Sequence, residues 1–569
     1  MPKNESGDLI TRQYVNFRGV DFTGEDVSLY RSPNALNVWK NYRNLGKCIE
    51  TRPDLELFKS FNNSIYGLFF YTINTIEHMI IHCGVGLFDY NMHTQEQKTI
   101  KAVGMNPRKS ESFIYNNIFY IKDGINYLEY DGETCSEVVG TIPITTIGRA
   151  PGGGGTPYQD VNLLTPYRKN SFCADGTSKE YHLDTTEIAN ASVTAWVNGV
   201  VETHFTIDAT NGIITFTTAP AKPLTDGQDN VVIQFYKEVN GHRNRINKCT
   251  LLCVFDNRVF FSGNQDYPNT IFHSSLDDPR YVSDLDFYNE GLDMSKVKAM
   301  IPGNNALWVL KEPSQGNTTI FYHNPTIDSE YGKVYPSTHS NISTGCVATG
   351  INFNDDIVFF SDRGMEGING DITTEQVVAH RSSLIDSKLL TESNYKDLIL
   401  QEWEGYLLVI IGNKVYLADS NAMFTNETHN EYEWFYWELS ESITCAAVKD
   451  NILYLCSGNG IFTLTKEENL NVNSYWTTCE DDFKNPNMRK TTNKKGCVVD
   501  MDGEEITILA KTDDGEFEEI GTYENTKGYI VSRIKRKKWK DIQLKFSSTK
   551  YFALRSCTLE SFVGSYVKR

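Results

Sequence analysis

The chain has 569 residues, of which 40% are hydrophobic and 12% aromatic, and its formal net charge is −19. This composition indicates a folded, strand-rich protein, and the negative charge argues against binding nucleic acid or membrane surfaces through the protein as a whole. No apolar run reaches the roughly 18 residues of a membrane span, and the N-terminus lacks a signal-peptide pattern, so we expect a chain made and kept in a cytosol, with no membrane span.

Two proline-containing stretches mark the first part of the chain, Tyr30–Val38 and Thr51–Phe58. Pro33 and Pro53 disfavour regular helix, because proline lacks a backbone N–H and restricts the residue before it. We therefore predict that residues 1–58 form an extended entry segment that leads into the first strands.

From residue 65 onward, pairs of short apolar runs recur with a turn rich in Asp, Asn or Gly between them. The clearest is Asp355–Gly370, and similar stretches occur at Asn117–Tyr130, Tyr406–Asp419 and Asn451–Thr465. Such a pattern is typical of tight β-hairpins.

The hairpins recur with a regular period. Seven comparable turns lie at Gly84, Gly124, Gly263, Glu312, Gly364, Gly412 and Gly458. Neighbouring turns are 40 to 52 residues apart, except for one interval of 139 residues. This period is typical of a β-propeller, so we predict an all-β fold with a propeller of about seven blades, formed by residues 59–145 and 241–480. The alternative is a string of unrelated hairpins in two β-sandwiches.

The long interval contains a separate block, residues 146–240. It opens with the glycine-rich stretch Arg149–Pro157, which is typical of a flexible linker. Asn-Gly pairs at 198–199 and 211–212 follow alternating apolar and polar residues and predict two tight hairpins. We therefore predict a small β-sandwich inserted between two blades.

Further strand-like runs follow the last hairpin, for example Glu505–Ala510 and Asp541–Phe546. They predict a C-terminal β-sandwich domain at residues 481–569. Helix is expected to be scarce, and residues 381–395 are the best candidate for a short one.

The sequence contains no nucleophile elbow, zincin motif, phosphate-binding glycine loop or zinc-spaced Cys/His cluster. Acidic pairs at 277–278, 355–356 and 513–514 lie in predicted turns, where Asp is favoured because it bonds nearby backbone amides. A hydrolase would need two carboxylates at a defined separation instead. We predict no catalytic residue, no metal site and no cofactor, and twelve cysteines that are reduced and mostly buried.

One charge feature stands out in this acidic chain: Tyr529 to Lys550 contains eight basic residues and one acid. A phosphate backbone or an acidic neighbouring subunit can bind such a patch, and a solvated strand face that protects a sheet edge is the alternative. The candidate residues for contact with DNA or a subunit are Arg533, Lys535, Arg536, Lys537, Lys538 and Lys540. Trp539 among them, and the aromatic run Tyr432–Trp437, are candidates for core, the latter with a sugar-stacking surface as its alternative.

Several stretches resemble the bacteriophage tail-nozzle and packaged-DNA stabilisation proteins of the head-to-tail neck. Ser32–Val38 (SPNALNV), with Thr51–Asp54 (TRPD) after it, is similar to their entry motif. The other similar stretches are Arg258–Gly263 followed by Ile271–Tyr281, which ends in Asp-Pro-x-Tyr; Gly345-Cys346; Phe359–Ile368; and residues 197–220, which resemble a small sandwich common in phage tail proteins. The resemblance covers roughly residues 25–465.

The resemblance implies a structural virion protein without catalysis, with a β-propeller core, assembled in the bacterial host cytoplasm. Its expected partners are other copies of itself in a ring, with a hexamer implied, the phage portal and adaptor, other tail proteins, and packaged DNA passing through the channel. Two rival interpretations remain open: a carbohydrate-active propeller enzyme that uses the aromatic residues and acidic turns, and a non-catalytic tail protein that binds a glycan or receptor.

Overall fold

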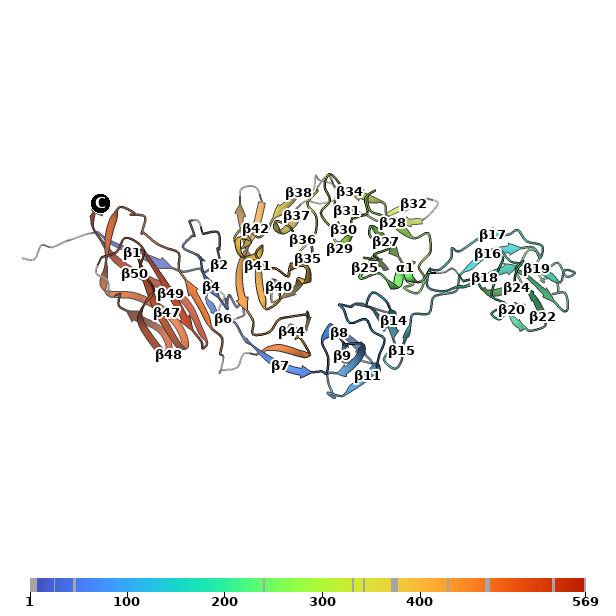
Figure 1. The fold of residues 1–569 in the computed structure, drawn as a ribbon, viewed down its shortest axis with the longest axis horizontal. Helices are drawn as coiled ribbons and strands as arrows, with labels where there is room; N and C mark the ends of the chain where they lie inside the picture. Colours follow the sequence, from blue (N-terminus) through green and yellow to red (C-terminus); the bar gives the residue numbers. More distant parts are fainter. Residues whose placement is uncertain are drawn as a thin grey trace, which may run out of the picture. The chain divides into compact units, whose positions relative to one another are not determined.

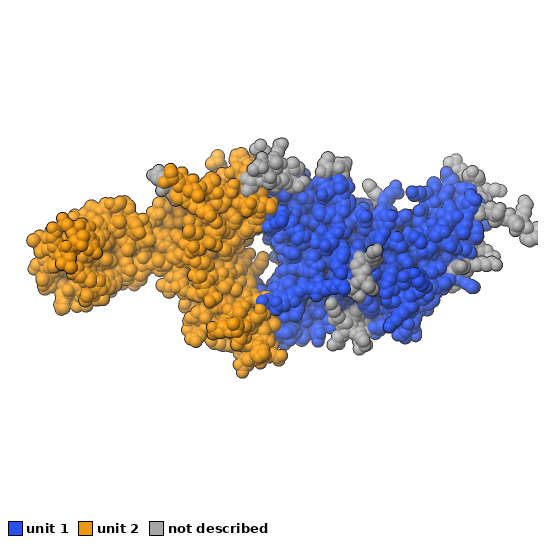
Figure 2. All heavy atoms as spheres, turned by 180° about the vertical axis from the view of Figure 1, so that it is seen from behind, with its two compact units in different colours: residues 1–68, 344–569 blue, residues 69–343 orange. Residues whose placement is uncertain are grey.

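The structure is a computed structural model, and it describes residues 8–24, 26–43, 48–238, 241–329, 332–340, 343–369, 377–426, 429–465, 471–534 and 538–566. The chain forms two compact units: unit 1 is residues 1–68 with 344–569, and unit 2 is residues 69–343 (Figure 2). Strands dominate both units (Figure 1). The helices of the described residues are single turns: α1 (Asn244–Asn247), α2 (Asp386–Leu389), which lies in the stretch expected to be helical, and the 3-10 turn η1 (Tyr395–Asp397).

Four four-stranded antiparallel sheets of one pattern belong to unit 2, apart from the first residues of β8. Each strand pairs with the one before it, and in the fourth sheet the hairpin β32–β33 (Thr326–Asp328, Gly332–Val334) precedes the last strand. The strands are β8 (Ile65–Ile73), β9 (Ile76–Cys83), β10 (Gly86–Asn91) and β11 (Gln97–Lys101); β12 (Glu111–Tyr115), β13 (Ile118–Lys122), β14 (Tyr127–Tyr130) and β15 (Cys135–Glu137); β25 (Leu251–Phe255), β26 (Arg258–Ser262), β27 (Thr270–His273) and β28 (Phe287–Asn289); and β29 (Val297–Gly303), β30 (Ala306–Lys311), β31 (Ile320–His323) and β34 (Ser337–His339).

Unit 1 contains three more sheets of this pattern. In the last of them, β45 pairs with β7, which comes before every other blade strand in the sequence. β7 covers the edge that β45 would otherwise leave open. The strands are β35 (Gly350–Phe353), β36 (Asp356–Ser361), β37 (Gly364–Asn369) and β38 (Val377–His380); β39 (Ile399–Trp403), β40 (Tyr406–Ile411), β41 (Lys414–Asn426) and β42 (His429–Glu438); and β43 (Cys445–Lys449), β44 (Ile452–Ser457), β45 (Gly460–Thr465) and β7 (Asp54–Ser60). Each of these seven sheets has the strand pattern of a β-propeller blade, as predicted, with four blades in unit 2 and three in unit 1.

Every blade joins its first two strands by a two-residue turn in which both residues have positive φ. This is the geometry of a type I′ turn, whose twist matches that of the strands, and Asn and Asp tolerate it better than other non-glycine residues. The turns predicted from the sequence instead join the second and third strands of the same blades. The seven type I′ turns are Asn74-Thr75, Asn116-Asn117, Asp256-Asn257, Asn304-Asn305, Asn354-Asp355, Glu404-Gly405 and Asp450-Asn451.

The inserted block is a small β-sandwich, as predicted, with its own buried core around Phe172, Tyr181 and Ile233. Asn198-Gly199 joins two of its strands directly, since Val197 pairs with Val200. The glycine-rich stretch is a hairpin loop and not a linker, because the Arg149 guanidinium donates to the carbonyls of Gly154 and His182. One sheet has β17 (Thr156–Pro157), β16 (Ile144–Arg149), β18 (Tyr167–Phe172), β24 (Val231–Tyr236), β20 (Thr194–Val197) and β21 (Val200–Glu202), and the other has β19 (Glu180–His182), β23 (Ile213–Phe216) and β22 (Phe205–Asp208).

The C-terminal β domain is a nine-stranded sheet that includes much of the N-terminal segment. Residues 1–58 were expected to form only an extended entry, but β1 pairs with β50 over its whole length and β4 pairs with β46. These pairings join residues about 440 to 550 positions apart, so no local pattern signals them. The strands are β1 (Leu9–Tyr14), β4 (Ala35–Leu36), β5 (Val38–Trp39), β6 (Ile49–Thr51), β46 (Ser474–Thr477), β47 (Met488–Thr512), β48 (Glu518–Ser532), β49 (Ile542–Ser548) and β50 (Phe552–Tyr566); the two-stranded pair β2 (Gly19–Val20) and β3 (Arg31–Ser32) lies nearby in the chain.

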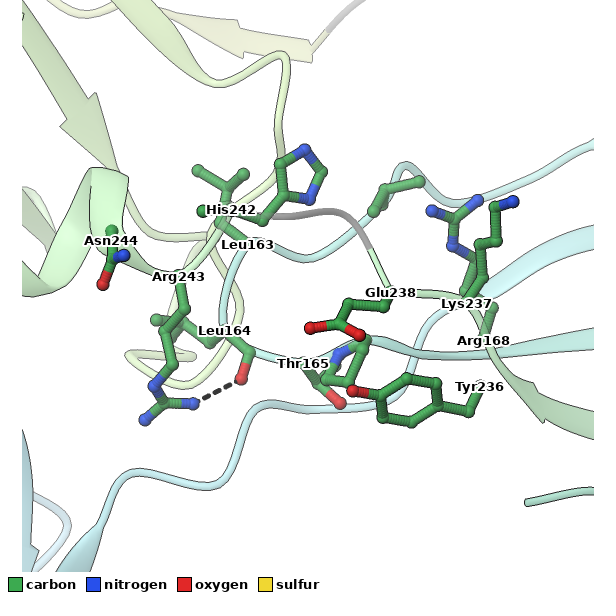
Figure 3. A pocket seen from close by; sticks show the side chains of 13 residues that line it. Leu163, Leu164, Thr165, Arg168, Tyr236, Lys237, Glu238, His242, Arg243 and Asn244 are labelled. Atoms are coloured by element: carbon green, nitrogen blue, oxygen red, sulfur yellow. Dashed lines mark hydrogen bonds between the residues drawn. The ribbon is translucent and has the colours of Figure 1, made fainter. Parts of the chain in front are cut away.

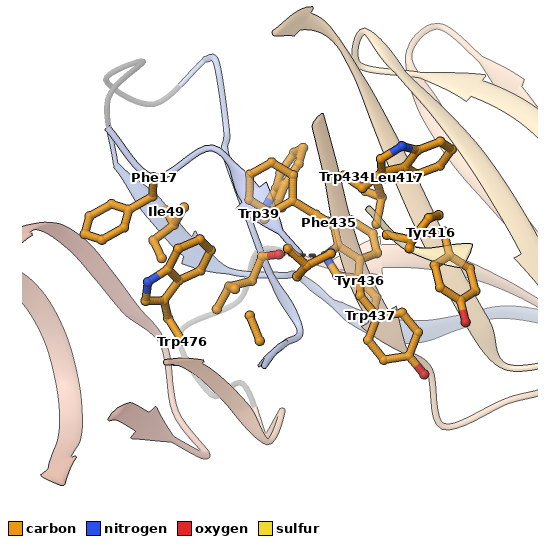
Figure 4. Close-up of a cluster of buried hydrophobic side chains, with 14 of the residues drawn as sticks. Phe17, Trp39, Ile49, Tyr416, Leu417, Trp434, Phe435, Tyr436, Trp437 and Trp476 are labelled. Carbon is orange, nitrogen blue, oxygen red and sulfur yellow. Dashed lines mark hydrogen bonds between the residues drawn. The ribbon is translucent and has the colours of Figure 1, made fainter. Parts of the chain in front are cut away.

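One continuous core runs through unit 1, from the fifth and sixth blades to the C-terminal sheet. Its aromatic centre is Trp39 on β5, which stacks on Trp403 with ring centroids 5.3 Å apart and meets Trp437 edge-on at 5.6 Å. Figure 4 labels Trp39 and Trp437 among the buried side chains of this core. Every residue of Tyr432–Trp437 is buried, which confirms the prediction of this run as core. Nine of the twelve cysteines are also buried.

Candidate functional site

The structure places three of the six candidate basic residues, and all three are exposed: Arg533, Lys538 and Lys540. They lie in the loop between β48 and β49 of the C-terminal sheet. Lys535, Arg536 and Lys537 lie outside the described residues. The three placed cations therefore share one loop and face solvent.

Trp539 anchors this loop in the core. Its side chain is fully buried and packs edge-on against Phe483 at 5.3 Å, and its backbone exchanges two hydrogen bonds with Lys490. Lys545, which belongs to the same basic stretch of sequence, is not part of the exposed set, because its Nζ lies 3.9 Å from the centre of the Tyr475 ring. The fixed position of Trp539 holds the exposed lysines on either side of it at the surface.

The end of β48 continues this surface. Residues alternate between exposed and less exposed along the end of the strand, so that Lys527, Tyr529 and Val531 lie on its exposed face, and the exposed Arg533 follows at the start of the loop. Tyr529 is 76% exposed and Val531 51%. On the neighbouring strands, the Arg555 guanidinium pairs with the carboxylates of Asp500 and Asp502. We call Lys527, Tyr529, Val531 and Arg533 the β48 strip.

Three polar residues of the entry motif that carries the family resemblance, Ser32, Asn37 and Arg52, are buried and hydrogen-bonded. Asn37 has φ of 55°, and its side-chain oxygen accepts hydrogen bonds from Arg52 Nε at 2.9 Å and from the backbone N–H of Glu438 at 2.8 Å. The Arg52 guanidinium also donates to the carbonyls of Pro53 and Glu438. Burial lowers the pKa of Arg52 to about 10, against the opposing effect of Asp54.

The same motif bonds the C-terminal sheet. Ser32 Oγ donates to the Thr477 carbonyl at 2.6 Å, and the Asn37 side-chain amide donates to the Asn473 carbonyl at 2.8 Å. Glu438 ends the sixth blade, whereas Thr477 ends β46 of the C-terminal sheet. Ser32, Asn37 and Arg52, which we call the joint, therefore hold both parts to one segment.

The acidic pairs have turn and structural roles. Asp355 is the second residue of a type I′ turn, while Asp356 accepts two hydrogen bonds from Arg381, at 2.7 and 3.2 Å, and one from the Tyr432 hydroxyl. At the other two pairs, Asp278 accepts the N–H of Arg280 and Asp513 accepts the N–H of Lys540. Of these bonds, only the one to Asp278 comes from a nearby backbone amide as predicted. Asp356 instead begins β36 and pairs with side chains, and Asp513 bonds an amide 27 residues away.

A charged cluster that the sequence did not signal lies beside the fifth blade. His380 bonds Glu366 through Nδ1 at 3.2 Å and Asp386 through Nε2 at 2.5 Å. Burial alone would lower the pKa of His380, but the hydrogen bonds to Asp386 and Glu366 outweigh it and raise the pKa to about 10. The imidazole is therefore cationic at neutral pH and joins α2 to β37 and β38.

This cluster predicts a pH-dependent stability. The folded pKa of about 10 exceeds the ordinary value of 6.5, so the stabilisation is fully present below pH 6.5 and is lost as the pH rises toward 10. For a partly exposed ion pair we expect His380→Gln to lower the free energy of unfolding by about 2 kcal/mol near pH 6 and by little near pH 10. Urea unfolding of both proteins across this range measures the difference, with the exposed His93→Gln as control. A gap that stays constant with pH would contradict the assignment.

A cavity of about 360 Å³ lies in unit 2, where the chain leaves and re-enters the insert (Figure 3). Leu163, Leu164 and Pro166 line one side, and Tyr236 and Lys237 line another. Because its walls come from both ends of the insert, no local sequence pattern signals it.

Most of the cations around this cavity are already bonded. Arg243 donates to the Leu164 carbonyl (Figure 3). It also donates to the Val138 carbonyl, and Lys237 donates to the Thr186 carbonyl. Arg168 Nε has no hydrogen-bond partner among the residues that the structure describes, and burial lowers the pKa of the Arg168 guanidinium. Burial and Arg245 lower the pKa of His242. The hydrogen bonds of Arg243 and Lys237 around the cavity hold the base of the insert in place.

Within the part of the chain that the structure describes, no three His, Cys, Asp or Glu side chains are grouped so as to hold a metal ion. Among the same residues, no helix has the length and apolar character needed to cross a membrane.

No protein-family model and no curated protein sequence matches the chain. Among solved structures it is similar to BamB from Moraxella catarrhalis, with a TM-score of 0.35 and 12% identity over 73% of this chain and 99% of that one. It is also similar to BBS1N in complex with ARL6DN (TM-score 0.26, 9% identity, 74% and 98% covered) and to the extracellular domain of the putative one component system BT4673 from B. thetaiotaomicron (TM-score 0.25, 11% identity, 90% and 78% covered). TM-scores this low carry no argument about function, and the assignment of the propeller rests on the seven blades themselves.

Proposed function

We propose that the chain is a structural subunit of a bacteriophage neck or tail. In this role it is one copy of a ring, with six copies expected, that extends the DNA channel below the portal and adaptor and helps to retain and deliver the packaged genome. The proposal requires no catalytic residue and no cofactor.

The joint is the observation that carries the proposal. Ser32, Asn37 and Arg52 belong to the two short stretches that resemble the entry motif of the nozzle and stabilisation family, and all three are buried. They bond groups more than 380 residues away in the sequence. The motif thus supports one architecture, because its hydrogen bonds tie the N-terminal segment both to the sixth blade and to the C-terminal sheet. The resemblance in sequence therefore coincides with residues that determine how the subunit is built.

The charge of the chain fits passage of DNA. A net charge of −19 gives a surface that repels phosphate over most of its area, so that DNA can slide along a wall made from it. The exposed cations of the β48–β49 loop, Arg533, Lys538 and Lys540, remain candidates for contact with DNA or with a neighbouring subunit.

The test uses virions of the phage that encodes the chain. Particles assembled without it are expected to package DNA and then lose it, which a nuclease-protection assay of encapsidated DNA measures. A C-terminal tag labelled with gold is expected to lie at the neck or tail in electron micrographs. Restoring the protein from a plasmid is the control.

Other outcomes would decide between the rivals. Particles that keep their DNA but no longer adsorb to cells would contradict the proposal and favour a glycan- or receptor-binding tail protein. Turnover of a glycan by the purified chain would favour the enzyme.

A further inference from the structure

We propose that Cys445 and Cys456 are a redox pair, which forms a disulfide across the first two strands of the seventh blade when the chain meets a small-molecule disulfide such as oxidised glutathione. The bond links β43 covalently to β44, and a reducing cytosol keeps the two thiols apart as free thiols. Both cysteines belong to one chain and one blade, so the pair does not depend on the proposed role in a virion.

The two cysteines lie directly opposite each other on neighbouring antiparallel strands. Cys445 is the first residue of β43, and its partner across the ladder is Cys456 of β44. Opposite residues of an antiparallel pair point to the same face of the sheet, and their Cα atoms are about 4.5 to 5.5 Å apart. A disulfide needs a Cα separation of about 4.4 to 6.8 Å, so this pair can form one without a movement of the backbone.

The same positions in other blades hold ordinary strand residues. Counted from the type I′ turn, they are Leu251 and Ser262 in the third blade and Ile399 and Ile410 in the sixth. Two cysteines at this position are therefore not a requirement of the blade pattern.

Another pair of neighbouring thiols in unit 1 has a different register. Cys497 lies opposite Leu559, and Cys557 lies opposite Val499, so these two cysteines are diagonal neighbours on β47 and β50. Diagonal Cα atoms are about 7 to 8 Å apart, which is too far for a disulfide unless the backbone moves. The strand register thus distinguishes the pair that can form a disulfide from one that cannot.

The surroundings of the two thiols determine which one reacts first. Cys456 is 0% exposed, and a hydrogen bond with Cys445, together with burial, raises the pKa of its thiol. A raised pKa leaves little thiolate, and the thiolate is the nucleophile. Cys445 retains 9% exposure and directly follows the exposed Thr444. Cys445 is therefore the thiol that attacks the oxidant, and Cys456 is the one that completes the disulfide.

The reaction is a thiol–disulfide exchange in two steps. The Cys445 thiolate attacks one sulfur of oxidised glutathione, which forms a mixed disulfide and releases one glutathione thiolate. Cys456 then loses its proton and attacks the sulfur of Cys445, which forms the protein disulfide and releases the second glutathione thiolate. The two protein thiols lose two electrons and two protons, and the oxidised glutathione gains them as it becomes two thiols.

The disulfide strengthens the blade in which two distant parts of the chain meet. The seventh blade consists of β43, β44, β45 and β7, so its fourth strand comes from the N-terminal part of the chain. The bond closes a loop from residue 445 to residue 456, which reduces the conformational freedom of the opened hairpin. Oxidation therefore makes local opening of β43 and β44 rarer.

The experiment uses the unchanged full chain, first reduced and then incubated with oxidised glutathione in native buffer. Free thiols are alkylated, and the chain is digested with trypsin without a reductant. Cleavage after Lys414, Lys449 and Lys466 gives the peptides 415–449 and 450–466, which contain one cysteine each. Mass spectrometry is expected to find these two peptides joined, and dithiothreitol should separate them. On a non-reducing gel the oxidised chain should migrate as a single chain, because the bond is internal.

Hydrogen exchange followed by mass spectrometry measures the effect on the blade. Amide protection in β43 and β44 should rise at least about tenfold on oxidation and return to its first value on reduction. A double variant with Cys445→Ala and Cys456→Ala should show neither the joined peptides nor the rise. Cys497→Ala, which removes one thiol of the diagonal pair, is the matched control and should show both.

Three results would overturn the proposal. The first is a folded chain that stays without joined peptides in excess oxidised glutathione. The second is a bond from Cys445 or Cys456 mainly to some other cysteine. The third is a Cys445–Cys456 bond that leaves the protection of β43 and β44 unchanged. The first two are read on the unchanged chain, so they stand even if the cysteine variants fail to fold.

Discussion

Replacing Trp39 by alanine is expected to lower the free energy of unfolding of unit 1 by about 4 kcal/mol. The side chain is 3% exposed and lies between Trp403, Tyr406 and Trp437. Alanine would leave a cavity that stacked indole rings cannot easily fill, so the loss includes both the buried surface and the cavity. The effect is large because Trp39 is on β5 of the C-terminal sheet and its partners are on β39, β40 and β42 of the sixth blade.

The measurement must separate the two units. Hydrogen exchange followed by mass spectrometry reports amide protection in each unit, and urea unfolding gives the free energy. Trp39→Ala should weaken protection in β5, β39 and β42 and leave the insert unchanged. Trp39→Phe should cost less, and Tyr30→Ala, at an exposed position, should cost under about 0.5 kcal/mol. A loss below about 1 kcal/mol for Trp39→Ala, or an equal loss of protection in the insert, would show that these rings do not hold the blade to the sheet.

The repeat of the propeller was predictable because its signal is local. Each type I′ turn uses two adjacent residues, such as Asn116-Asn117 or Asp450-Asn451, and the flanking strands are continuous apolar runs. The glycines used to count the blades belong to the second turn of each blade, where the backbone is less uniform: Glu312 stands where the other blades have glycine. The Asn and Asp doublets of the first turn are the more regular signal of the two.

The C-terminal sheet was only partly predictable. β49 alternates strictly between buried and half-buried residues, which a local pattern reveals. The contribution of β1 and β6 was not foreseen, because their hydrogen-bond partners on β50 lie near the other end of the chain. Pro33 and Pro53 were correctly taken to exclude helix, but they do not tell whether an extended segment is solvated or paired.

Surface features, too, are only partly predictable from the sequence. Exposure of Arg533, Lys538 and Lys540 follows from charge alone. Burial of Trp539 among them depends on tertiary packing. So does the exposure of the apolar residues Leu285, Phe287, Leu292 and Met294 around β28, which the sequence alone does not indicate.

The acidic pair at 355–356 offers the sharpest test between a scaffold and an enzyme. Asp356 is expected to be a structural residue: its carboxylate is bonded to the Arg381 guanidinium, whose side chain is only 5% exposed, and to the Tyr432 hydroxyl. Asp356→Asn removes the charge that compensates Arg381 and is expected to lower the free energy of unfolding by about 3 kcal/mol. Asp355→Asn is the matched control, since asparagine tolerates the positive φ of 63° at this turn, and it should change stability by less than about 0.5 kcal/mol.

A second substitution separates loss of the ion pair from loss of the side chain. Combining Asp356→Asn with Arg381→Met removes both buried charges, so the double variant should be more stable than Asp356→Asn alone, and urea unfolding of the four proteins gives the coupling free energy. A glycan-hydrolysis assay on the same proteins addresses the rival enzyme. If Asp356→Asn kept full stability and abolished hydrolysis that the unchanged chain performs, Asp356 would be a catalytic carboxylate and the scaffold interpretation would be wrong. A large loss of stability that the double variant partly recovers would instead show that Asp356 is structural. Its bonds to Arg381 and Tyr432 would then hold the fifth blade against the sixth.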